Sequence, residues 1–133
     1  MNKQEVLAEA QLLADHSQFA MLGTNSGDGY PHIKALIKME NEGLKTVWFS
    51  TNTSSKRVKQ LLNDPKASVY FLDDENWAGL MLVGDVEILQ DDASRKRLWR
   101  EGYEKYYPLG VNDPDYTVLR FTAHWGNYYH GLA

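Results

Sequence analysis

Hydrophobic and polar residues alternate with two different periods near the start of the chain. Residues 2–15 repeat apolar side chains every three or four positions, which predicts an amphipathic helix, and Asn2 and Glu5 have the spacing of a capping box. Residues 30–39 alternate strictly between the two classes, which predicts a half-buried strand. One face of this strand would carry Ile33, Ala35, Ile37 and Met39, and the other His32, Lys34, Leu36 and Lys38.

Short apolar runs between turn residues predict further strands. They cover residues 19–24, 44–51, 66–72, 77–89, 116–123 and 126–131. Gly84 lies inside the longest run, where glycine indicates a bulge or a barrel bend. Two more helices are predicted, one beginning near residue 56 and one over 91–107. Because tight turns join most of the strands, we expect a single mainly β (α+β) domain over residues 1–133, an antiparallel barrel of six or seven strands with flanking helices.

Composition narrows the classes of partner. The 133 residues are 43% hydrophobic and 24% charged, as in a globular domain. The formal net charge of −4 argues against a nucleic-acid partner, and no apolar run approaches the ~20 residues that a membrane-spanning helix needs. The N-terminal residues lack the apolar core of a signal peptide, which favours the cytoplasm. Cysteine is absent and the four histidines lack metal-ligand spacing, so we expect no metal site.

The stretch FSTNTSSKRVKQLL, residues 49–62, is the strongest candidate for chemistry. Threonine and serine hydroxyls precede a helix whose first residues are Lys56 and Arg57, although the helix dipole disfavours cations at that end. Hydroxyls, cations and unpaired backbone N–H groups together would form an anion site. The alternative is a serine-capped helix with a solvated basic first turn. The residues alone leave both interpretations open.

The remaining polar and aromatic candidates are interpreted as structural. Paired carboxylates stand in turns or at helix starts, where capping accounts for them. The tryptophans are interpreted as core or interface residues. Each histidine is interpreted as a surface or packing residue; the four are His16, His32, His124 and His130.

In their order along the chain, three stretches resemble the pyridoxamine-5′-phosphate-oxidase-like flavoproteins of the FMN-binding split-barrel fold, in particular the general-stress-protein subgroup. They are VWFSTNTSSKRVKQLLNDPKASVYF, PHIKALIK and VLRFTAHWGNYYHG, and Gly84 matches the glycine of the family's central strand. The first resembles the family's phosphate-binding core, with its two cations exchanged in order. The resemblance implies these FMN-binding residues: Ile33, Lys34, Ala35, Leu36, Ile37, Lys38, Phe49, Ser50, Thr51, Ser55, Lys56, Arg57 and Tyr129.

The resemblance also implies an assembly and a chemistry. It implies a homodimeric split barrel with two FMN sites at the subunit interface, each built from both chains. Hydride transfer at the flavin N5 would act on an unknown small-molecule substrate, with NADH or NADPH as a candidate electron donor. The true oxidases have a C-terminal Arg-Leu-x-His segment and an Arg/Ser cluster that this sequence does not show, and a glutamine of theirs aligns with Gly79. We therefore expect flavin binding without pyridoxamine-phosphate oxidation.

Three functions remain open at this point. The first is an FMN-dependent oxidoreductase, and the second is a flavin-binding or stress-related module without turnover of its own. The third is a split barrel that holds haem, a deazaflavin or no cofactor. No side chain stands out as a general acid or base, which does not separate the first two because the flavin itself carries the hydride chemistry.

Overall fold

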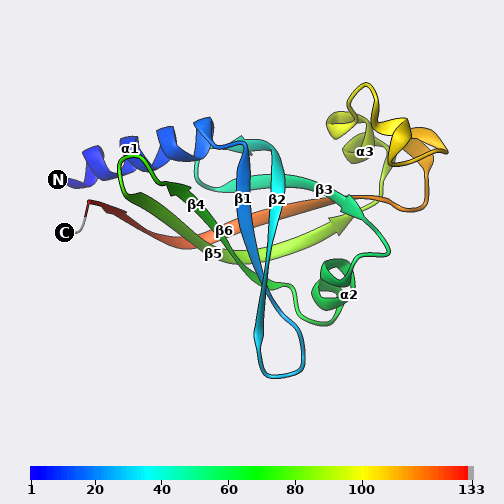
Figure 1. Cartoon of the computed structure of the whole chain (residues 1–133), viewed down its shortest axis with the longest axis horizontal. Helices are drawn as coiled ribbons and strands as arrows, with labels where there is room; N and C mark the ends of the chain where they lie inside the picture. Colours follow the sequence, from blue (N-terminus) through cyan, green and yellow to red (C-terminus); the bar gives the residue numbers. More distant parts are fainter. Residues whose placement is uncertain (132–133) are drawn as a thin grey trace.

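Six antiparallel strands form a closed barrel in the computed structural model, which describes residues 1–131 (Figure 1). The strands are β1 (Phe19–Asn25), β2 (Pro31–Glu42), β3 (Thr46–Asn52), β4 (Lys66–Asp73), β5 (Ala78–Leu89) and β6 (Tyr116–His130). Their order around the barrel is β1–β2–β3–β6–β5–β4, and β4 pairs back onto β1. The prediction of an antiparallel barrel is confirmed, with the smaller of the two expected strand numbers.

Residues 116–130 form one strand, so the prediction of two strands separated near residue 124 is wrong. The pairing of β5 with β6 shifts at this point, because Val83 pairs with Trp125 while Gly84 pairs with Ala123. His124 is left over as the extra residue of a bulge, which bends the strand without ending it. A Cβ atom at Gly84 would overlap the carbonyl oxygen of Thr122, so this close approach requires glycine.

Three helices flank the barrel within the described residues: α1 (Lys3–His16), α2 (Lys56–Asn63) and α3 (Asp92–Leu98). Asn2 is the N-cap of α1, as its spacing from Glu5 suggested, and its side chain accepts a hydrogen bond from the Glu5 amide. The Glu5 carboxylate accepts from the Asn2 side-chain amide, where a standard capping box would use the Asn2 backbone amide. Figure 1 shows α2 at the far end of the barrel from the two chain termini. None of the helices described is long and apolar enough to cross a membrane.

The third helix ends at Leu98, much earlier than the predicted limit of residue 107. Trp99 leaves the helix with extended backbone angles, and Gly102 adopts a left-handed φ of 91°. Two short 3₁₀ turns follow, η1 (Tyr103–Lys105) and η2 (Gly110–Asn112). The apolar side chains that suggested a longer helix instead form an aromatic cluster over the outer face of β3 and β6. In it Trp99 meets Tyr116 edge to face with ring centroids 5.2 Å apart.

The barrel interior holds the main core, and it determines which face of each strand is buried. Leu22, Phe49 and Val69 point inward and are fully buried. On β2, Leu36 pairs with the buried Ala20 and reaches this core. The inner face of β2 is therefore the one that also carries His32, Lys34 and Lys38.

The apolar face of β2 points outward, although alternation suggested that this face would be buried. Ile33 is 74% exposed and Ile37 is 61% exposed. The strand pairing extends this surface onto β1, where Phe19 pairs with Ile37 and is 57% exposed. Alternation correctly predicted which residues share a face of β2. Which of the two faces points to the core depends on the direction in which the barrel curves, and the sequence does not reveal that direction.

Candidate functional site

The site is built around the first turn of α2. Ser55 is the N-cap residue, and its hydroxyl accepts a hydrogen bond from the Val58 amide at 3.3 Å. Val58 and Leu61 anchor the helix on the barrel and are both 3% exposed. Lys56 and Arg57 are thus held beside the positive end of the helix dipole, and their charges and the unpaired amides of the first turn attract an anion.

A small pocket is lined by cationic side chains from α2 and β2. Lys56 and Arg57 of α2 face Lys34 of β2 across a volume of about 80 Å³. The rest of the lining comes from β1, β2 and α2, namely Thr24, His32, Ile33 and Gln60. Pockets that enclose a whole ligand measure about 300–1,000 Å³, so this one has the size of a subsite for a single charged group.

One donor in this pocket has no acceptor. The Nε atom of Arg57 is buried and has no hydrogen-bond partner among the described residues. A buried N–H without an acceptor is costly, and more so when the group is charged. The pocket therefore has three cationic side chains and an unused guanidinium donor, a combination that fits a phosphate or another oxyanion.

A carboxylate in the turn just before β6 fixes the loop that leads into α2. Asp115 accepts hydrogen bonds from the Ser54 amide at 2.8 Å and from the Asn52 side chain at 2.7 Å. Its carbonyl oxygen also accepts from the Thr53 amide at 2.7 Å. The Asn52 and Ser54 donors hold the pKa of the Asp115 carboxyl below its usual value. In the sequence this residue looked like an ordinary turn acid, because nothing local shows its contact with a loop some 60 residues earlier.

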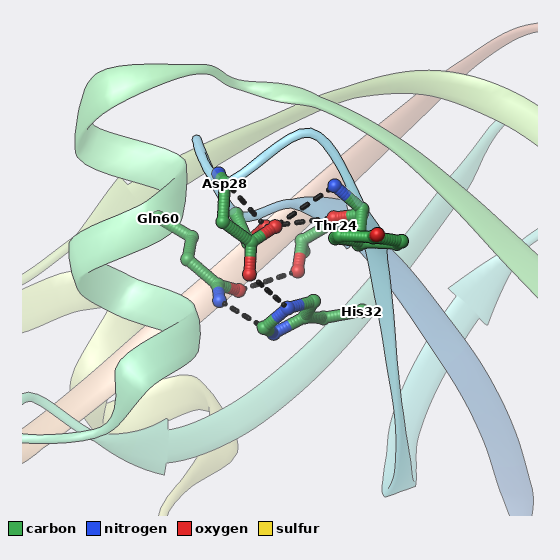
Figure 2. Close-up of polar contacts among 6 residues, drawn as sticks. Thr24, Asp28, His32 and Gln60 are labelled. Atoms are coloured by element: carbon green, nitrogen blue, oxygen red, sulfur yellow. Dashed lines mark hydrogen bonds and ion pairs between the residues drawn. The ribbon is translucent and has the colours of Figure 1, made fainter.

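A chain of polar contacts joins the pocket to the β1–β2 hairpin, as Figure 2 shows. The Thr24 hydroxyl lies 2.6 Å from Gln60 Oε1, Gln60 Nε2 lies 3.2 Å from His32 Nδ1, and His32 Nε2 lies 3.2 Å from Asp28 Oδ2. His32 is therefore a member of the pocket as well as a surface residue. Two spacings could have indicated this: His32 is two positions before Lys34 on one strand face, and Gln60 is one helical turn after Lys56.

The β3 residues of the predicted site precede the loop that leads to α2, and their side chains are mostly buried. Phe49 is fully buried in the barrel core, so only its backbone can reach a ligand. Thr51 is 8% exposed, and Ser50 has a buried hydroxyl without a hydrogen-bond partner in the part of the chain that the structure describes. Ala35 and Ile37 lie on the outward face of β2 described above.

The Lys38 side chain, predicted to contact FMN, is bound to the end of α1 in the single chain. Its ammonium group donates to the carbonyl oxygens of Ala14 and Asp15 and to the Asn41 side chain. It therefore neutralises the negative end of the α1 dipole. Burial lowers the pKa of Lys38. The side chain does not line the basic pocket, which takes its β2 lysine from position 34.

Tyr129 lies towards the other end of β6, beside Tyr70 of β4. The two phenol oxygens are 2.8 Å apart, and burial raises the pKa of Tyr70 to about 12. Gly79 lies beneath the pair, where a Cβ atom would come within 2.6 Å of the Tyr129 ring. The two phenols thus occupy the space that a larger residue at Gly79 would need. The predicted site residues are therefore spread over a single chain. Lys34, Lys56 and Arg57 line the pocket, Lys38 is bound to the end of α1, and Tyr129 lies towards the other end of β6.

The chain is similar in sequence and fold to proteins of known structure. A Clostridium acetobutylicum protein related to general stress protein 26 of B. subtilis, of the pyridoxinephosphate oxidase family, is 51% identical. The match covers 99% of this chain and 93% of that one, with a TM-score of 0.89. General stress protein 26 of Bacillus anthracis shares the fold at 17% identity, with 96% and 94% of the two chains covered and a TM-score of 0.75.

A third structure is the general stress FMN/FAD binding protein of Xanthomonas citri. It is 19% identical, covers 98% of this chain and 92% of its own, and has a TM-score of 0.80, which shows a common fold. No curated protein matches the chain. The family model described as pyridoxamine 5′-phosphate oxidase matches residues 6–130. On this match and on the 51% identity above, the chain belongs to the pyridoxamine 5′-phosphate oxidase family.

Proposed function

We propose that the protein binds FMN and that the terminal phosphate of FMN occupies the pocket between β2 and α2. The observation that carries this proposal is the buried Nε atom of Arg57, a charged donor without a partner among the described residues, beside Lys34 and Lys56. Arginine binds phosphate as a fork and lysine as a point charge, so the two complement each other around a dianion. The family and the FMN/FAD binding protein of X. citri support the choice of a flavin.

The size of the pocket favours FMN over FAD. FMN ends in a phosphate monoester, whereas both phosphates of FAD are linked on two sides. A subsite of about 80 Å³ suits a terminal group that enters it from one direction. A monoester also carries more negative charge per phosphate than a diester, which suits three cations.

We further propose that two copies of the chain form the complete flavin site. The outward barrel face carries large apolar side chains that are 39–74% exposed on the single chain: Phe19, Met21, Ile33, Ile37, Leu72 and Trp125. Exposed apolar surface on this scale is typical of an interface. Ile33 also lines the basic pocket, so a second copy packed on this face would lie next to the flavin. Tyr129 of that copy is the residue we expect to contact the flavin ring.

As chemistry, we propose an FMN-dependent oxidoreductase with a small-molecule substrate. The flavin, when bound, supplies hydride transfer at N5. Lys34, Lys56 and Arg57 hold its phosphate and thereby fix its position. We found no group of three His, Asp or Glu side chains suited to a metal ion within the described residues, and Cys is absent from the sequence.

A binding experiment tests the cofactor. Purified protein is titrated with FMN, FAD and riboflavin, and flavin fluorescence gives the dissociation constants. We expect FMN to bind most tightly and riboflavin, which lacks the phosphate, at least about tenfold more weakly, since charge-assisted hydrogen bonds contribute about 1.5–3 kcal/mol each. Equal affinity for FMN and riboflavin would refute the phosphate assignment. Binding of haem or a deazaflavin in place of FMN would refute the cofactor assignment.

Turnover needs a separate measurement. The FMN-loaded protein is mixed anaerobically with NADH or NADPH, and the flavin absorbance is followed. Bleaching, followed by recovery when an electron acceptor is added, is the result expected of an oxidoreductase. A flavin that binds tightly and is reduced by neither nucleotide would favour a flavin-binding module without turnover from these donors.

Sedimentation velocity tests the second copy. We expect a dimer at micromolar concentration, and we expect Phe19→Glu to shift it towards monomer by placing a charge in the apolar face. Leu109→Glu is the matched control, because Leu109 is 74% exposed but lies outside that face. A monomeric wild-type protein that still binds FMN would contradict the shared site.

A further inference from the structure

The contacts in Figure 2 form a chain with a defined direction of donation. It begins at Asp28, where the Ser26 hydroxyl and the Tyr30 amide hold the pKa of the carboxyl below its ordinary value. An ionised carboxylate only accepts, so His32 donates to it from Nε2. Nδ1 of the neutral ring is then an acceptor, and the Gln60 amide nitrogen donates to it.

The donor and acceptor roles of Gln60 in turn determine the hydrogen bond of Thr24. With its nitrogen turned towards His32, Gln60 presents Oε1 to β1, and the Thr24 hydroxyl donates to that oxygen at 2.6 Å. Thr24 is 3% exposed and lines the basic pocket. While His32 is neutral, the one proton of this hydroxyl points to Gln60 and is not available to an anion in the pocket.

Protonation of His32 would reverse this arrangement. Nδ1 would become a donor, so the Gln60 amide would have to turn its oxygen towards the ring and its nitrogen towards Thr24. The Thr24 hydroxyl would then accept from Gln60, and its own proton would be free to point into the pocket. One added proton would therefore supply both a positive charge beside the pocket and a hydroxyl donor inside it.

We propose that His32 is a positioning residue that strengthens phosphate binding in the β2–α2 pocket as the pH falls, by adding a charge and by releasing the Thr24 hydroxyl through Gln60. This inference rests on the proposed function, since it concerns the same pocket. Histidine suits such a role because its charge changes between about pH 5 and 8.

The charged groups around His32 come from three elements. Asp28 of the β1–β2 loop is paired with the ring, and its negative charge favours the protonated form. Lys34 of β2 and the two cations of α2 also line the pocket, and their charges oppose it. A bound phosphate dianion would offset those cations and so favour protonation. By linkage, protonation must then strengthen phosphate binding by the same factor.

The test compares FMN with riboflavin at about pH 6 and about pH 8 in the wild type and in His32→Asn. The phosphate itself gains a proton near pH 6, which weakens FMN binding in both proteins alike, so only the ratio between them reports on His32. We expect the ratio of wild-type to variant FMN affinity to be about three- to fivefold larger at the lower pH than at the higher pH. Riboflavin affinity should not show this difference.

His124→Asn is the matched control. His124 is also paired with a carboxylate, 2.7 Å from Asp85, and the two pairs have comparable exposure: 55% and 47% for these side chains against 44% and 55% for His32 and Asp28. It does not line the β2–α2 pocket. Its variant should follow the wild type at both pH values.

A second measurement needs no variant that might misfold. The ring protons of the four histidines are followed by NMR through a pH titration, with and without FMN. We expect the His32 signals to titrate at higher pH when FMN is bound and the His124 signals to be unchanged. An equal FMN ratio between wild type and His32→Asn at both pH values, or a His32 titration that FMN does not move, would overturn the inference and leave FMN binding standing. Absence of any FMN binding by the wild type would overturn the proposed function as well.

Discussion

The helices α2 and α3 begin in the same way and differ in the charge that follows. Both have a side-chain N-cap: Ser55 accepts from the Val58 amide, and Asp91 accepts from the Ser94 amide at 3.0 Å. The first turn of α3 then carries an acid, whereas the first turn of α2 reads Lys-Arg-Val. An acid at this end complements the helix dipole and a cation opposes it.

On the proposed function, this difference separates a helix start that serves stability from one that serves binding. The start of α3 satisfies its own dipole. The start of α2 is left electrostatically incomplete, beside a pocket that contains a third cation, Lys34, and an unpartnered donor of Arg57. Removing charges from the two helices should therefore have opposite consequences.

The largest effect is expected from Arg57→Ala and Lys56→Ala. Each should weaken FMN binding by about 10- to 100-fold, because a charge-assisted hydrogen bond to phosphate contributes about 1.5–3 kcal/mol. Fluorescence titration measures the affinity, and Lys96→Ala, which removes an exposed cation from α3, is the control that should leave it unchanged. An FMN affinity unchanged in both α2 variants would remove the distinction between the helices.

Asp91→Ala should show the reverse behaviour. Losing the N-cap of α3 should lower the free energy of unfolding by about 1 kcal/mol, as is typical of such caps. FMN affinity should stay at the wild-type value, because no residue of α3 lines the pocket. Figure 1 shows α3 as a helix separate from α2. Chemical denaturation followed by circular dichroism measures the stability. A large loss of FMN affinity here would mean that α3 takes part in the site.

A smaller effect is expected where the α2 loop is fixed to the turn before β6. Asp115→Asn should cost about 0.5–1 kcal/mol of stability, since one of its two accepting oxygens becomes a donor that faces an N–H group. Because folding lowers the pKa of the wild-type carboxyl, its contribution is complete above the unfolded pKa and is lost as the pH falls through the folded value. Unfolding measured at neutral and acidic pH should therefore show the two proteins converging in acid; a constant gap would contradict this origin.

The smallest expected change in stability tests most directly whether Lys56 opposes the dipole of α2. Lys56→Glu, measured without FMN, should raise the free energy of unfolding by about 0.3–1 kcal/mol, because an acid now complements the dipole of α2. The same variant should lose FMN binding. Reduced stability without FMN would show that Lys56 supports the fold and was not placed for an anion.

Local patterns predicted those parts of the fold that depend on neighbours in sequence. The Asn2 cap with its partner Glu5, the Ser55 cap and the bulge at Gly84 follow from short spacings and from the backbone needs of one residue. The end of α3 did not follow, because the packing of Trp99 against Tyr116 prevailed over helical periodicity.

The candidate site was predictable in its centre and not at its edges. Lys56 and Arg57 stood out because they oppose a dipole that the sequence itself implies. Asp115 acts through a contact with Ser54 across 61 positions, which no local pattern reveals. His32 and Gln60 meet across 28 positions, and their spacings from Lys34 and Lys56 are the one local signal for them. The resemblance also placed Lys38 near the flavin, yet its three acceptors belong to α1 and to Asn41, and its ammonium group is thereby engaged.

The two-sided character of β2 has a consequence for how the protein should be measured. This strand presents Lys34 to the β2–α2 pocket on one face and Ile37 to the exposed apolar surface on the other. If one strand serves both the cofactor and a second copy, the two equilibria are linked by mass action. The apparent affinity for FMN would then rise with protein concentration, and a dilute sample would lose cofactor and partner together.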